Sequence, residues 1–264
     1  MARKRIRLGC LGILFIMPIL FGPENGYGES PVSESVIELD LSDKKALSEL
    51  GRGVVGKALS AEPITDTAAL MPLRKGIWTY RLLPGDQKGA NQEDVITRSK
   101  HGRSGISWRR VIGKKCIEYF LVTERGDIKM VTEVDLEEDV LTRYRPAFSM
   151  MFNGMRPGEK SEVETDIRVY DLHDPTHEKY RGHLKVTHTY IGAYEVNVPA
   201  GRYSTVLIKS SYEGKVGPAT VRDVGYAFYA AGVGMVASIE RMRVTAFLVY
   251  DKRTRTPKVL VHAN

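Results

Sequence analysis

Residues 161–172 read SEVETDIRVYDL, and their side chains alternate in character along the chain. The alternate positions form two sets, Val163, Thr165, Ile167 and Val169 on the one hand and Glu162, Glu164, Asp166 and Arg168 on the other. Successive side chains of a β-strand point to opposite faces, so a period of two separates an apolar face from a charged one. This stretch therefore predicts a half-buried strand of an antiparallel sheet.

Segments of the same kind fill the chain on both sides of this strand. From about Lys75 onward, roughly eleven strand-like segments are separated by turn-forming residues such as PGDQKGANQ at 84–92. No long amphipathic helix interrupts them. The pattern predicts a mainly β fold, either a large curved antiparallel sheet or a partly open barrel, with a short helical or loop lead-in at its N-terminal side.

The lead-in covers residues 29–71 and is predominantly polar. Ser42 is expected to cap a short helix through DKKALSEL at 43–50, which Gly51 and Gly53 would end. Residues 60–72, SAEPITDTAALMP, have the composition of a linker. Residues 72–264 are then expected to form a single antiparallel β domain.

The first 28 residues have the pattern of a secretory signal peptide. MARKRIRLG carries four basic residues, CLGILFIMPILFG at 10–22 is apolar, and Gly26 and Gly28 supply the small residues of a cleavage site. The apolar run of thirteen residues is shorter than the roughly 20 that a membrane-spanning helix needs. Cleavage would leave no transmembrane segment, and the expected location is the periplasm. Secretion from the cell and an N-terminal anchor remain as alternatives.

Charge and cysteine content argue against several classes of protein. Removing residues 1–28 takes away four basic residues and one acid, so the formal net charge falls from +7 to about +4. This modest charge, the expected export and the lack of an RNA-binding motif argue against a nucleic-acid partner. Cys116 is the only cysteine after residue 28, which excludes an internal disulfide in the processed chain.

A methionine-rich and phenylalanine-rich segment is the candidate ligand-binding region. PAFSMMFNGMRPGE at 146–159 places flexible, polarisable side chains next to aromatic rings, a combination that suits an adaptable lipophilic surface. The candidate contacts are Phe148, Met150, Met151, Phe152 and Met155. Core packing is the favoured interpretation of the same residues, because any sheet protein must fill its interior.

A histidine-rich segment offers a different hypothesis. In DLHDPTHEKYRGHLKVTH at 171–188, His173 and His177 have the H-x3-H spacing that would place both rings on one side of a helix, where they could bind a metal. Pro175 lies between them and favours a loop. His183 and His188 are five residues apart on an expected strand and should point to opposite faces.

Two glycine motifs are interpreted as turns of the sheet. Pro199 and Gly201 suit a tight turn, since proline fixes φ and glycine accepts a positive φ. In YAAGVGMVA at 229–237, Gly232, Gly234 and Ala237 match the dinucleotide-binding spacing G-x-G-x-x-A. That motif requires a following helix in a βαβ unit, whereas strand-like segments surround it here, so no cofactor is predicted.

The same region resembles a known group of proteins. EVNVPAGRYSTVLIK at 195–209 and YAFYAAGVGMVASIE at 226–240 are similar to the V-P-A-G-x-[FY] and Y-A-P-G-V-G-x-V motifs of a domain-of-unknown-function family of bacterial envelope proteins. Trp78, Tyr80 and MRPGEKSEV at 155–163 add to the likeness, and Ala231 departs from the usual proline. The resemblance implies a periplasmic, β-rich fold similar in style to the half-barrels of lipoprotein carriers, and it supplies no catalytic residues.

These observations favour an exported, non-enzymatic envelope protein, although they do not exclude an enzyme. Such a protein would bind or shuttle a hydrophobic or amphiphilic ligand such as a lipid, or scaffold envelope components. The alternative function is a metal-binding protein or metal-dependent envelope hydrolase built on His173 and His177. No nucleophile motif supports catalysis by a serine or cysteine.

Overall fold

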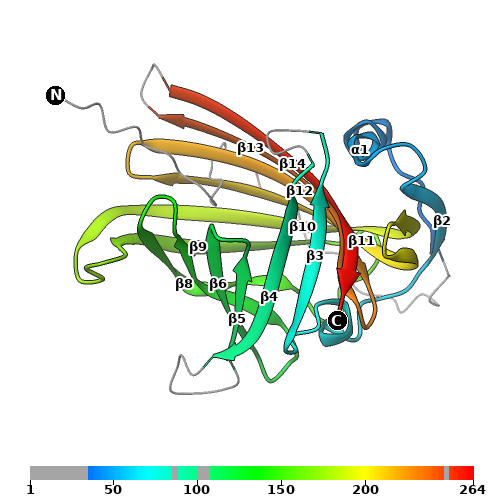
Figure 1. Cartoon of the computed structure of the whole chain (residues 1–264), viewed down its shortest axis with the longest axis horizontal. Helices are drawn as coiled ribbons and strands as arrows, with labels where there is room; N and C mark the ends of the chain where they lie inside the picture. The colour runs from blue at the N-terminus through cyan, green and yellow to red at the C-terminus, as the bar shows by residue number, and fades with distance from the viewer. Residues whose placement is uncertain (1–34, 85–88, 100–106, 247–249) are drawn as a thin grey trace, which may run out of the picture.

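Twelve antiparallel strands, β3 to β14, form a closed barrel (Figure 1). The computed structural model describes residues 35–84, 89–99, 107–246 and 250–264, so the expected signal peptide lies outside the described residues. The strands are β3 Gly76–Leu82, β4 Asn91–Ser99, β5 Ser107–Ile112, β6 Cys116–Val122, β7 Ile128–Asp135, β8 Val140–Met151, β9 Lys160–Asp171, β10 Glu178–Val198, β11 Gly201–Val216, β12 Ala219–Ala230, β13 Gly234–Ala246 and β14 Tyr250–Ala263.

Each barrel strand pairs with the next one along the chain, and β14 pairs with β3 to close the sheet. Closure leaves every barrel strand with two neighbours, which removes the free edges that an open sheet presents. The predicted mainly β architecture with a curved sheet or barrel is confirmed. Strand β9 also follows its predicted pattern: Thr165, Ile167 and Val169 are buried, while the charged positions between them are exposed.

Strand β10 is long enough to pair with two different strands along the same edge. Its first part, up to Thr189, pairs with β9, and after a register shift between Tyr190 and Gly192 it pairs with β2 (Val55–Ala61). The two-residue strand β1 (Ser35–Val36) pairs with β2 in turn. The lead-in is therefore attached to the barrel by main-chain hydrogen bonds.

The predicted helix of the lead-in is present as α1 (Leu41–Leu47), continued by a 3₁₀ turn over Ser48–Leu50. It ends as expected at Gly51, which has φ +102°. The predicted cap, Ser42, is wrong, because Asp40 lies at the N-cap and its Oδ1 accepts the N–H of Asp43 at 2.7 Å. The aspartate occupies the non-helical position from which a side chain can reach the free N–H groups of the first turn.

Helix α1 packs against the outer wall of the barrel, beside β11 to β14 (Figure 1). Its buried Ala46 and Leu47 belong to an apolar cluster with outward-facing residues of these strands. Asp43 accepts a hydrogen bond from Tyr226 Oη at 2.7 Å and lies 2.7 Å from Lys209 Nζ. The contact thus combines apolar burial with a partly buried ion pair.

Residues 60–72 differ from the expected linker, because they contain the end of β2 and a second helix, α2 (Thr67–Leu70). This segment crosses one mouth of the barrel. Ile64 exchanges main-chain hydrogen bonds with Met155 and Gly154 between β8 and β9, and Ala69 accepts one from Gly232 between β12 and β13. Together with buried Leu70 and Met71, these bonds join turns that are far apart in the sequence.

The Asp43 contact predicts how strongly α1 is attached. Replacing Asp43 with Ala leaves Lys209 and the Tyr226 hydroxyl without their shared acceptor, and should lower the free energy of unfolding by about 3 kcal/mol. Urea denaturation followed by circular dichroism measures this change. The matched control is Glu38→Ala, which removes only a 3.7 Å pair of exposed side chains with Lys44 and should change stability by less than about 0.5 kcal/mol. Equal effects of the two variants would contradict the proposed anchoring.

Candidate functional site

Neighbouring strands bring a charged network into the barrel interior. Arg110 on β5 lies between Asp94 on β4, at 2.7 Å, and Glu118 on β6, at 3.3 Å. Lys258 on β14 lies 4.0 Å from Asp94 and 4.8 Å from the centre of the Tyr80 ring. Burial opposes the charged form of Asp94, but Arg110 and Lys258 outweigh it and hold its pKa below the usual value.

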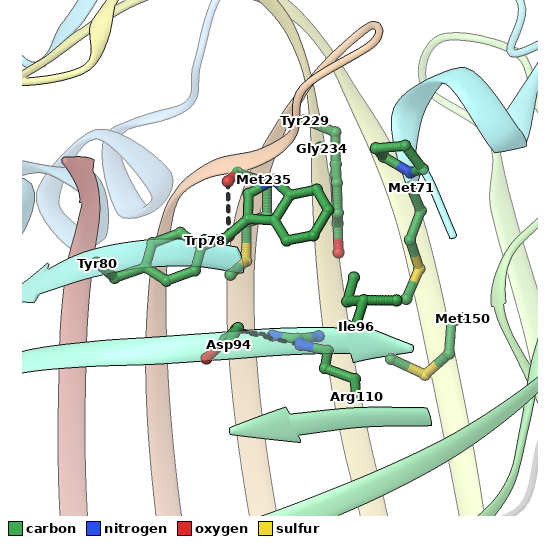
Figure 2. Close-up of a pocket in the computed structure, with 11 residues that line it drawn as sticks. Met71, Trp78, Tyr80, Asp94, Ile96, Arg110, Met150, Tyr229, Gly234 and Met235 are labelled. Carbon is green, nitrogen blue, oxygen red and sulfur yellow. Dashed lines mark hydrogen bonds and ion pairs between the residues drawn. The ribbon is translucent and has the colours of Figure 1, made fainter. Parts of the chain in front are cut away.

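A small cavity adjoins this network (Figure 2). Trp78 Nε1 donates to the carbonyl of Val233 at 2.7 Å, and Tyr80 Oη donates to that of Met235 at 2.9 Å, so both rings are held against the start of β13. The volume is about 50 Å³, enough for only a few water molecules. The lining residues are Met71, Pro72, Trp78, Tyr80, Asp94, Ile96, Arg110, Met150, Tyr229, Gly234 and Met235.

Further acids lie in the same interior. Burial, followed by the charge of Glu118, raises the pKa of Glu133 to about 8, and Tyr144 Oη donates to its Oε2 at 3.1 Å. Burial likewise raises the pKa of Asp223 well above its usual range, with a further contribution from Glu240, to which it is hydrogen bonded. Burial therefore favours the protonated, hydrogen-bonding form of both carboxyl groups over the free anion.

A larger groove lies where the lead-in crosses the barrel mouth. It has a volume of about 540 Å³ and is bounded by β2, the following segment with α2, and strands β10 to β12. Its lining residues are Leu59, Ser60, Glu62, Pro63, Ile64, Thr65, Asp66, Ala69, Leu70, Tyr190, Ala193, Ser204, Thr205, Val206, Tyr229 and Ala231. Most of these surfaces are apolar, and the charged members of the set are the two acids, Glu62 and Asp66.

Tyr229 and the α2 segment separate the groove from the inner cavity. Tyr229 lines both spaces, while Leu70 lines the groove and the adjacent Met71 lines the cavity. Tyr190 Oη donates to the carbonyl of Glu62 at 3.0 Å and fixes the start of the crossing segment. The groove is therefore a preformed surface feature whose floor is held by hydrogen bonds and core packing.

The structure places the predicted ligand-binding residues in and around the apolar core. Phe148, Met151 and Met155 are buried members of that core, and Phe152 packs at its edge with its ring 5.6 Å from that of His188. Met150 lines the inner cavity. None of the five is among the described residues that line the groove, and their role in ligand binding stays a prediction.

His173 and His177 lie exposed in the turn between β9 and β10. His173 Nε2 is 3.4 Å from Asp139 Oδ1, whereas the main-chain N–H of His177 bonds to Asp174. Within the described ranges, no group of three or more histidine, cysteine, aspartate or glutamate side chains is arranged to hold a metal ion. The metal hypothesis therefore gains no support from this loop.

The other two histidines point to opposite faces of β10, as predicted. His183 faces outward near Asp166, while His188 is buried and contacts Ser210 Oγ at 2.8 Å and the carbonyl of Ser149 at 2.9 Å. Burial lowers the pKa of His188 to about 4, so its ring is neutral at neutral pH. It acts as a hydrogen-bonded member of the interior.

The glycine motifs occupy turns. Pro199 lies in the β10–β11 turn, and Gly201, which opens β11, has φ +140°. Gly232 and Gly234 have φ +73° and +101° and connect β12 to β13 as an antiparallel hairpin. A strand rather than a helix follows them, so the structural context of a dinucleotide-binding motif is absent from this hairpin.

The interior acids and the groove were missed by the sequence analysis. In CIEYF, Glu118 is two residues from both Cys116 and Phe120, which are buried on the inner face of β6. An acid in phase with apolar positions of a strand is the signal that could have identified it. The groove has no comparable signal, because its walls come from segments that are distant in the sequence.

Comparisons with known proteins give distant structural similarity. No protein-family model and no curated protein matches the chain. The chain is similar to a crystal structure of a candidate exported protein with a YmcC-like fold from Bacteroides fragilis, with TM-score 0.45 and 16% identity over 77% of this chain and 99% of that one. A candidate lipoprotein from Parabacteroides distasonis gives TM-score 0.36 and 13% identity over 74% and 98% of the two chains. These similarities are too distant for a function to be transferred.

The interior acids predict an unusual dependence of stability on pH. The pKa of Glu133 rises from 4.5 to about 8 on folding, so the folded state holds a proton that the unfolded state has lost. Its stabilising contribution is complete below pH 4.5 and is lost as the pH rises toward 8. His188 gives the opposite trend, with stability lost as the pH falls from 6.5 toward 4.

Between pH 6.5 and 8, the free energy of unfolding of the wild-type protein should fall as the pH rises, because Glu133 loses its proton. In Glu133→Gln this slope should be smaller by up to about 1.4 kcal/mol per pH unit. Urea midpoints across this range measure the slope. Glu162→Gln is the control, because hydrogen bonding to Lys185 lowers the pKa of Glu162 and keeps it ionised throughout. A wild-type slope retained in Glu133→Gln would show that Glu133 does not hold this proton.

Proposed function

We propose that this protein is an exported envelope protein that binds an amphiphilic ligand in the groove between its lead-in and strands β10 to β12. The groove is the observation that carries the proposal, since its volume of about 540 Å³ falls within the range of roughly 300–1,000 Å³ that is typical of small-molecule sites. The N-terminal sequence pattern supports export to the periplasm. In the described part of the chain, no helix has the length and apolar character of a membrane span.

The chemistry of the lining supports an amphiphile rather than a polar metabolite. Leu59, Ile64, Leu70 and Val206 supply apolar surface for a hydrocarbon segment. Thr65 and Ser204 are exposed polar residues at the same groove, where they can contact the hydrated part of a ligand. A single elongated molecule could thus satisfy both kinds of surface.

The charges of the groove favour a neutral or cationic head group. Glu62 and Asp66 both line it and are exposed, and no basic residue is among its described lining residues. A unit charge about 4 Å from an opposite charge gains about 1 kcal/mol even in a water-like dielectric, and a like charge is disfavoured by as much. The same acids would therefore select against carboxylate or phosphate head groups.

Binding in the groove can be tested with the neutral apolar probe N-phenyl-1-naphthylamine. The wild-type protein should enhance its fluorescence saturably, and Ser204→Trp should weaken binding at least tenfold, because the indole would occupy groove volume at an exposed position. Ser211→Trp on the same strand is the control, since Ser211 does not line the groove. Absence of saturable binding, or equal weakening by both variants, would refute the proposed function.

The head-group preference has a separate measurement. Dodecyltrimethylammonium should displace the probe at roughly 30-fold lower concentration than dodecanoate, because an attraction of about 1 kcal/mol for the cation and a repulsion of the same size for the anion differ by about 2 kcal/mol. Glu62→Gln should reduce this ratio without loss of probe affinity, since the Glu62 side chain is exposed and its structural hydrogen bond is made by its main-chain carbonyl. A preference for dodecanoate would contradict the assignment. Mass spectrometry of lipids extracted from the purified protein would then identify the natural ligand.

A further inference from the structure

The outer wall of strands β12 to β14 carries arginines directly opposite one another. Arg222 on β12 is in register with Arg243 on β13, which is in register with Arg253 on β14. In the same way Arg241 is opposite Arg255. Like charges directly opposite each other on neighbouring strands destabilise a sheet, so folding by itself does not account for this arrangement.

A hollow lies within this arginine-rich wall. It has a volume of about 280 Å³ and is lined by Thr220, Arg222, Arg243 and Thr245. The two threonines are in register on β12 and β13, one row away from the two arginines. Guanidinium and hydroxyl groups are hydrogen-bond donors that suit the oxygen atoms of a phosphate group, and the arginine fork matches such an anion geometrically.

The acids near the hollow offset only part of its positive charge. Asp251 accepts two hydrogen bonds from Arg243, at 3.0 and 2.8 Å, and also forms an ion pair with Arg253 at 3.5 Å. Glu213 is in register with Arg222, but Lys185 lies opposite Glu213 on its other side. Among the described residues, Arg222 forms no ion pair, and its side chain is exposed.

The other two arginines of the wall have a structural role. Glu49 in the 3₁₀ turn after α1 lies 2.7 Å from Arg241 and 3.4 Å from Arg255. This contact ties the lead-in to β13 and β14, and it explains the Arg241–Arg255 pair without a ligand. The row that contains Arg222 and Arg243 has no equivalent bridge from the lead-in among the described residues.

We propose that this hollow binds the phosphate group of an anionic phospholipid and so docks the outer wall of the barrel on a membrane surface. The hollow is open on a convex wall, where a free anion would keep much of its water. A membrane instead presents many phosphate groups at once. Arginines on neighbouring strands, which are about 4.8 Å apart, can bind several of these groups at the same time. Each arginine close to an anionic membrane contributes about 1 kcal/mol of attraction. The proposal is independent of the groove ligand.

Vesicle co-sedimentation of the protein purified from the exporting cell tests this site. Vesicles with about one third phosphatidylglycerol in phosphatidylcholine should bind the protein, more weakly as salt is added, whereas pure phosphatidylcholine should not. Arg222→Gln/Arg243→Gln should lower the partition constant roughly 30-fold, equivalent to about 2 kcal/mol. Arg222→Gln alone breaks no ion pair of the described residues and should lower it about fivefold.

The control is Arg168→Gln/Arg202→Gln, which removes the same charge from exposed positions on β9 and β11 away from the hollow. Both double variants keep the same N-terminal basic residues, so any contribution of these residues to vesicle binding is equal in the two and does not affect the comparison. Equal losses in both, or no binding to anionic vesicles, would overturn the proposal. Full competition by about 10 mM inorganic phosphate, at an ionic strength matched with chloride, would assign the hollow to a soluble anion and would overturn membrane docking.

Discussion

The pairing of β14 with β3 is the constraint on which the rest of the structure depends, because it turns an antiparallel meander into a closed barrel. About eight strands already enclose an interior that side chains can fill, and twelve enclose a wider one. Large inward residues such as Phe120, Phe148 and Tyr190 fill part of it. The lead-in supplies the remainder at one mouth, where Ile64, Leu70 and Met71 join the same core. Closure thus explains why a polar N-terminal segment is tightly packed.

Closure also places charged residues of the inner face in a medium where charge is costly. The interior meets this cost in two ways. Arg110 accompanies Asp94, whose pKa is held below its usual value, while burial raises the pKa values of Glu133 and Asp223 and so favours their protonated forms. The barrel interior therefore contains both ion-paired charges and carboxyl groups whose protonated form is favoured. The stability of the barrel is linked to pH through Glu133, because burial and the charge of Glu118 both oppose ionisation of its carboxyl group.

The sequence predicted those features in which local pattern and environment agree. The alternation in β9 specified both the strand and its buried face, and Gly51 and Gly232 specified turns through their need for positive φ. Glu118 and Glu133 were overlooked, because an acid on a strand normally indicates the solvent face, and the inward position of Glu118 shows only in its phase with the apolar Cys116 and Phe120. The groove was out of reach for another reason: β2, α2 and β10 to β12 become neighbours only through barrel closure and the crossing of the lead-in. The methionines of β8 show a further limit, since an apolar cluster has the same composition whether it packs a core or lines a site.

The two proposed sites have opposite charge and lie near opposite ends of β12, which lines both of them. Ser204, in the groove, and Lys215, in register with Thr220 beside the hollow, are eleven residues apart on β11, which is about 35 Å at the usual rise of about 3.3 Å per residue. At this separation the sites share no residue, and substitutions in one should leave the free energy of binding at the other unchanged. The acids of the groove disfavour the anionic head groups that the arginine hollow would attract. A barrel with this arrangement can rest on an anionic membrane without filling its groove with the lipids that hold it there, and the groove remains available for an amphiphile of different charge.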